Sequence, residues 1–119
     1  MYLLEIDQTH NRTHLTLSDH FDESEAKSLL DEFQQRIGEL KPDFHVLCDL
    51  TTLDEFESEA RTHFRELMDY FNGNGVRKII RITSKPLHDF GLTVMSHFHY
   101  GNDVHVITCE TFKEAQKHL

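Results

Sequence analysis

Five short segments rich in apolar residues have the length and flanking turns expected of β-strands. The first two cover residues 2–7 and 12–17, and the polar stretch 8–11 between them predicts an antiparallel hairpin. The later predicted strands cover residues 44–50, 76–83 and 103–108.

Between and after these strands, apolar residues recur every three or four positions, which indicates helices that bury one face. The four predicted helices begin at Asp22, at Glu57 or Ser58, at Lys85, and at Thr111. Asp22 with Glu25, and Thr111 with Glu114, have the spacing of a capping box, in which a side chain satisfies the first free N–H groups of a helix.

The predicted order is therefore ββαβαβαβα: an α/β domain over residues 1–119, with a five-stranded mixed sheet and four helices. Alternating strands and helices favour parallel pairing with right-handed crossovers, and only the first strand is expected to be antiparallel. We expect the helices to lie mainly on one side of the sheet. The short connections indicate a single domain.

Each predicted strand has two faces, because side chains alternate with a period of two. If the parallel strands lie in sequence order, the helix side holds Leu15, Leu17, Val46, Cys48, Ile80, Ile82, Val104 and Val106. The opposite face then shows His14, Thr16, His45, Leu47, Arg77, Ile79, Arg81, His105 and Ile107. We single out His14, His45, Arg81 and His105 as an open sheet face.

Three interpretations of this face stay open. It is solvated or covered by a helix, it is a surface for a homodimer or another protein partner, or it holds a metal through its histidines. The metal interpretation has the least support, because zinc needs three or four converging ligands and the sequence does not show convergence. We therefore assign no metal site.

The end of the third predicted strand and the segment after it form the second candidate site. Asp49, Thr51 and Thr52 follow an apolar run and lead toward a helix, and the carboxyl ends of parallel strands commonly bind ligands in open α/β sheets. Two hypotheses remain: the residues cap the helix, or they form a partner or ligand loop together with Ser58. The four acids at positions 54, 55, 57 and 59 would repel a phosphate there.

The composition disfavours several classes of partner. The chain has 12 Lys plus Arg against 21 Asp plus Glu, a formal charge of −9, which disfavours nucleic acid and anionic membrane surfaces as partners. No segment approaches the roughly 20 apolar residues that span a bilayer, so we expect no stable membrane insertion. Cys48 and Cys109, outside any CxxC motif, are expected to be buried free thiols of a cytoplasmic protein.

Catalytic motifs receive little support from the sequence. It has no Gly-x-Ser-x-Gly elbow, and its Gly73–Gly75 segment precedes a predicted strand instead of following one as a phosphate loop would. Cys48 lies inside an apolar strand, where burial raises the pKa of a thiol and makes it inert. We predict a protein that is not an enzyme and that needs no cofactor.

The order and spacing of several segments resemble those of a known group. They are Ile6-Asp7, Leu15-Thr-Leu17, the stretches 22–26, 44–51, 56–60 and 75–78, and Glu114-Ala115. Together they cover nearly the whole chain, which resembles the STAS and SEC14-like group, specifically the small bacterial SpoIIAA-like proteins. Anti-sigma-factor antagonists of that group carry a phosphorylated serine at the helix after the third strand. That position falls here on residues 57–60, where Ser58 is the remaining hydroxyl.

The resemblance implies a cytoplasmic protein-interaction or regulatory module, which we expect to self-associate. Two alternatives remain. The first is a SEC14-like binder of a small apolar ligand or lipid, which requires an internal cavity of several hundred Å³. The second is a phosphorylation-controlled regulator resembling an anti-sigma-factor antagonist, with Ser58 or a nearby threonine modified.

Overall fold

A computed structural model of the chain describes residues 1–83, 85 and 103–119. In chain order its elements are β1 (Tyr2–Asp7), β2 (Arg12–Phe21), α1 (Glu23–Arg36), the short 3₁₀ turn η1 (Ile37–Glu39), β3 (His45–Phe56), α2 (Ala60–Gly73), β4 (Lys78–Ile82), β5 (His105–Cys109) and α4 (Phe112–Gln116). The predicted helix that starts at Lys85 lies outside the described residues from position 86 onward. The other predicted elements are present.

The strands form one mixed sheet in the order β1-β2-β3-β4-β5. β1 pairs with β2 in antiparallel fashion, and each later pair is parallel. The β1–β2 hairpin turns at Asn11, whose φ of 51° places it in the left-handed region that asparagine tolerates. The predicted five-stranded mixed sheet is confirmed.

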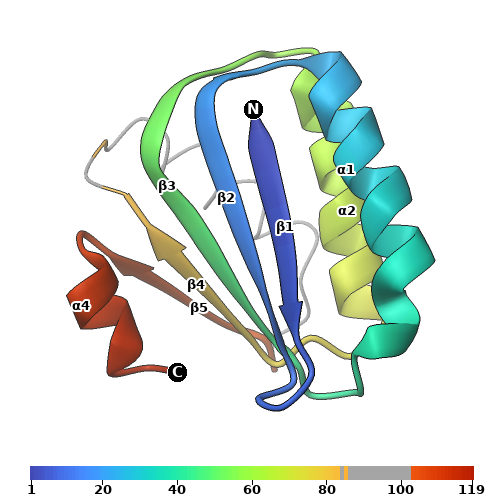
Figure 1. Ribbon diagram of the computed structural model, residues 1–119, viewed down its shortest axis with the longest axis vertical. Coiled ribbons are helices and arrows are strands. Elements are labelled where there is room, and N and C mark those ends of the chain that lie inside the picture. Colours follow the sequence, from blue (N-terminus) through green and yellow to red (C-terminus); the bar gives the residue numbers. More distant parts are fainter. Residues whose placement is uncertain (84, 86–102) are drawn as a thin grey trace.

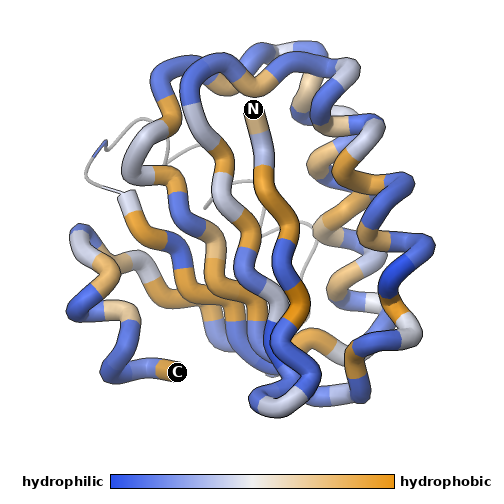
Figure 2. The backbone as a smooth tube through the Cα atoms, in the orientation of Figure 1, coloured by the Kyte–Doolittle hydropathy of each residue, from blue (hydrophilic) through white to orange (hydrophobic). Residues whose placement is uncertain are grey.

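Helices α1 and α2 cover one face of the sheet, and Figure 1 shows them side by side on the same side of the strands. Each helix buries its predicted apolar stripe, and Figure 2 shows hydrophilic residues along the outer side of α1. The larger hydrophobic core, which we call the main core, lies between these two helices and the sheet. Within it, the Phe33 ring of α1 contacts the rings of Phe44 and Phe71 at centroid distances of 6.4 and 4.8 Å. The main core therefore ties both helices to the start of β3.

The short helix α4 packs on the opposite face, against β4 and β5 (Figure 1). Thr111 caps its N-terminus, because the Thr111 hydroxyl accepts a hydrogen bond from the Glu114 backbone N–H at 3.2 Å. A second, smaller core lies beneath it and contains Leu47, Ile80, Ile82, Cys109 and Ala115. The expectation that the helices lie mainly on one side therefore holds for α1 and α2 and not for α4.

Strands β2 and β3 run further than predicted. Each continues past the end of β4, and the two keep pairing until Phe21 meets Phe56. The register between them shifts twice, and Asp19 at the second shift has a φ of 55°. These bulges break the period of two, which is why the sequence pattern did not indicate a strand there.

Candidate functional site

The structure places the three histidines of the predicted open face on one side of the sheet. Two cross-strand rows run across it: Asp7–Arg12–His45–Lys78–His105 and Glu5–His14–Leu47–Ile80–Ile107. Residues opposite one another on paired strands point to the same face. His14, His45 and His105 therefore share the side on which α4 packs.

Among the described elements, helix α4 contacts β4 and β5 on this side, and the β1–β3 part carries side chains that are exposed or half-buried. We call that part the open face; its members are Leu3, Glu5, Asp7, Arg12, His14, Thr16 and His45. Leu3 is 55% exposed and Glu5 is also exposed, while the others are half-buried. His105, at the far edge of the sheet, is exposed and continues the row beyond Lys78.

The prediction that Arg81 joins these histidines is wrong. In the register Arg81 lies between Cys48 and Thr108, so its side chain is on the other face, where it is only 4% exposed. Its guanidinium donates a hydrogen bond to the Thr108 hydroxyl at 3.4 Å. Ile79 shares that face, whereas Ile80 and Ile82 point to α4, which is the reverse of the predicted assignment.

The physical reason is that β4 is buried on both faces. Four of its five residues are buried, so polarity does not reveal which residues face which layer. A strand with two covered sides carries apolar residues at consecutive positions, and its alternation is lost.

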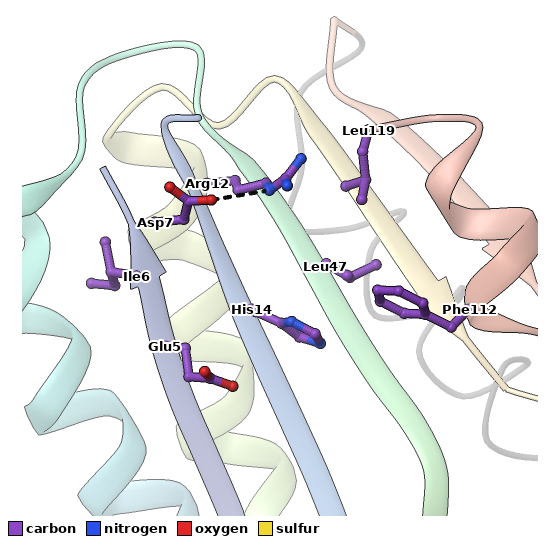
Figure 3. A pocket seen from close by; sticks show the side chains of 8 residues that line it. All are labelled: Glu5, Ile6, Asp7, Arg12, His14, Leu47, Phe112 and Leu119. Atoms are coloured by element: carbon purple, nitrogen blue, oxygen red, sulfur yellow. Dashed lines mark ion pairs between the residues drawn. The ribbon is translucent and has the colours of Figure 1, made fainter. Parts of the chain in front are cut away.

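A pocket of about 230 Å³ lies where the open face meets α4. Its lining, drawn in Figure 3, consists of Glu5, Ile6, Asp7, Arg12, His14, Leu47, Phe112 and Leu119. The His14 ring stacks on Phe112 with a centroid distance of 6.0 Å and an interplanar angle of 10°. The pocket is therefore lined by apolar side chains together with two acids and an arginine. The sequence analysis did not single out Glu5, Arg12 or Phe112.

Charges on this side are arranged unevenly. The Asp7 carboxylate has two basic neighbours, since it lies 3.8 Å from Arg12 Nε and 2.7 Å from His10 Nδ1. Partial burial lowers the pKa of His45, and the positive charges of Lys78, Arg12 and Arg77 lower it further. A basic region around His45 therefore lies beside the acids of β1, although the whole chain is strongly acidic.

The second candidate site is strand where a loop was predicted. Asp49, Thr51 and Thr52 belong to β3, which continues to Phe56. Thr51 donates a hydrogen bond to Asp49 from its hydroxyl at 2.7 Å and another from its backbone N–H at 3.0 Å, and both threonines are exposed. Asp49 pairs with Thr16 and so lies beside that residue of the open face. Ser58 is exposed in the turn before α2 and is not adjacent to Asp49 in the sheet.

His20, which sequence analysis did not single out, lies at the same end of the sheet between two carboxylates. Its Nε2 is 2.6 Å from Glu57 and its Nδ1 is 3.1 Å from Glu55. The hydrogen bond with Glu57 is the largest cause that raises the pKa of His20, and the negative charges of both glutamates add to it. The pair of contacts joins the end of β2 to the end of β3.

We predict that a histidine titration by NMR gives opposite shifts for two imidazoles. The pKa of His20 lies above its ordinary value of 6.5 and falls in Glu57→Gln, whereas the pKa of His45 lies below 6.5. Because the folded pKa of His20 is raised, its contacts stabilise the fold below the ordinary pKa, and this contribution is lost as pH rises through the folded pKa. Glu23→Gln is the control and leaves His20 unchanged. A His20 pKa of 6.5 or below in the unaltered chain contradicts this arrangement.

Among the described residues, no group of three or more histidine, cysteine, aspartate or glutamate side chains is arranged to hold a metal ion. Both thiols are buried, and burial raises the pKa of Cys48 to about 12. Within the same residues, no helix is long and apolar enough to cross a membrane.

Comparisons with known proteins define the fold. No family model matches the sequence, and no curated protein sequence matches it. Among solved structures, an uncharacterized DUF3478-family protein with a SpoIIAA-like fold from Shewanella loihica PV-4 superposes with a TM-score of 0.75 at 14% identity, over 99% of this chain and 93% of that one.

The anti-sigma factor antagonist SpoIIAA in its unphosphorylated form also superposes, with a TM-score of 0.67 at 16% identity, over 99% of this chain and 96% of that one. Both matches span nearly the whole chain. The protein therefore has a SpoIIAA-like fold, which confirms the resemblance found in the sequence at the level of the fold.

Proposed function

We propose that this protein is a STAS-like protein-interaction module, without enzymatic activity, that binds another protein chain through its open face. The observation that carries the proposal is the half-covered sheet. Helix α4 seals the second core over β4 and β5, and beside it lie an exposed leucine, two acids, an arginine and two imidazoles on β1–β3.

The composition of the open face suits protein recognition. Leu3 is a large apolar side chain at 55% exposure, and Phe112 at the border of the pocket is 43% exposed. An arginine and an aromatic ring beside a pocket large enough for one side chain are typical of the residues that contribute most to binding in protein interfaces. The neighbouring Asp49 and Thr51 extend the same surface to the rim of the sheet.

The described residues support the two alternatives from the sequence less well. The pocket of about 230 Å³ is smaller than usual ligand sites and has Glu5, Asp7 and Arg12 in its walls, which does not suit a lipid. Ser58 is exposed, but acids at positions 54, 55, 57 and 59 lie close in sequence, and a phosphate there would meet like charges.

Site-directed photocross-linking in living cells tests the proposal. We expect a photoreactive residue at Thr16, on the open face, to give a discrete cross-linked protein band. The same residue at Ser28, exposed on α1, is the matched control and gives none. A band from Ser28 with none from Thr16 would place the interaction on the helices and refute the proposal.

A further inference from the structure

We infer that the open face binds a second copy of this chain, in a twofold arrangement that sets β1 of each copy over β2 of the other. This inference rests on the proposed function and names its partner. Its basis is the distribution of charge over two neighbouring strands, described by the cross-strand register.

The open face separates acids from bases by strand. Glu5 and Asp7 are successive outward residues of β1, and directly opposite them on β2 are His14 and Arg12. One column is therefore acidic, and the column beside it holds an imidazole and a guanidinium, both of which can donate hydrogen bonds to a carboxylate. Such a surface is complementary to itself after a half-turn, because the rotation exchanges the two columns.

The geometry fixes one twofold axis. An axis parallel to the strands, above the boundary between β1 and β2, keeps each row in place and exchanges the two strands. Glu5 of one copy then faces His14 of the other, and Asp7 faces Arg12. Every contact occurs twice, as an isologous interface requires. Sheets that pack face to face keep their strands nearly aligned, which this axis provides.

Pairing through the outer edge of β1 is the competing way to join two sheets. That edge is already engaged, because Arg36 of α1 donates a hydrogen bond to the Leu4 carbonyl at 3.3 Å. Glu39 holds the same guanidinium at 2.8 Å, so an added strand would have to displace an anchored side chain. Occupied edges resist strand addition, and the face is the more accessible surface.

The interface is small, so the dimer is expected to be reversible. Two strand columns with a few residues each cover less than the roughly 800 Å² per partner of a standard stable interface. Exposed acid–base pairs contribute specificity and are weakened by salt. The dimer should therefore form at high protein concentration and dissociate as ionic strength rises.

A charge swap measured by analytical ultracentrifugation tests the inference. Glu5→Lys removes the carboxylate that faces His14 of the partner at two symmetric positions, and we expect Kd to rise about tenfold. His14→Glu alone has the same effect, because it sets a carboxylate against Glu5 of the partner. The double variant places opposite charges at both positions and returns Kd to near its original value. Glu66→Lys, the same charge change on the exposed surface of α2, leaves Kd unchanged.

Circular dichroism of each variant confirms that it is folded, and the exposed position of Glu5 makes Glu5→Lys the safer single change. A double variant as weak as either single variant would overturn the inference. So would a chain that stays monomeric up to millimolar concentration. If Thr16 then cross-links in cells to a protein other than this chain, the proposed function survives and the second-copy partner does not.

Discussion

Replacing Phe33 by alanine is expected to remove about 3–5 kcal/mol of folding free energy, the usual loss for a fully buried phenylalanine. The Phe33 ring is 0% exposed and also contacts Tyr70 edge-on, at a centroid distance of 6.0 Å. Its removal leaves a cavity where α1, α2 and the start of β3 meet. Because small domains have only about 5–15 kcal/mol of stability, the variant should unfold at much lower denaturant concentration.

Urea unfolding followed by circular dichroism measures this loss. Phe112→Ala is the matched control, because the same substitution at a ring that is 43% exposed should cost far less. Equal losses at the two positions would mean that Phe33 is not in the main core.

Placing an aspartate at Ala115 is expected to release α4 from the sheet. Ala115 is 0% exposed and lies in the second core with Leu47 and Ile80. An unpaired carboxylate buried there would cost about 3 kcal/mol or more. Since α4 is only five residues long, detachment of the helix is the less costly response, and it exposes the second core.

Hydrogen–deuterium exchange detects that release. We expect Ala115→Asp to speed exchange in residues 112–119 and in β5, with α1 unchanged. Gln116→Asp, on the exposed side of the same helix, should leave the exchange pattern as it was. Identical patterns in the two variants would show that α4 does not seal the second face.

The predicted elements depend on signals that are local in sequence. The hairpin follows from the polar turn at residues 8–11, and α1 begins where Asp22 accepts a hydrogen bond from the Glu25 N–H at 2.8 Å. Helix stripes are also local, and both long helices bury theirs. These features depend on residues that are close in sequence, and the sequence pattern therefore predicts them.

The errors concern features that depend on distant partners. Residues 51–56 form strand because β2 extends beside them. The two register shifts mean that the buried Leu53 and the partly buried Phe56 do not follow a period of two. The face that each β4 residue occupies was misassigned because α4 covers its second side. The apolar stripe of α4 predicts that the helix packs on the sheet, but it does not indicate which face of the sheet the helix covers.

The candidate site was predictable only in part for the same reason. His14, His45 and His105 came together because the strands lie in sequence order, which was a condition of the prediction. Arg81 was placed with the histidines because each β4 residue was assigned to the wrong face of the sheet. The acids on β1 that define the open face were not considered, because their importance comes from the cross-strand pairing of Glu5 with His14 and of Asp7 with Arg12.

Cysteine labelling tests most directly whether the open face is a protein-binding surface. The two natural thiols are buried, so a maleimide should report mainly on an introduced cysteine. We predict that Thr16→Cys reacts readily in dilute purified protein and slowly in the concentrated protein or in intact cells. Ser28→Cys on α1 should react at the same rate throughout. Equal labelling of Thr16→Cys under all these conditions would contradict the account.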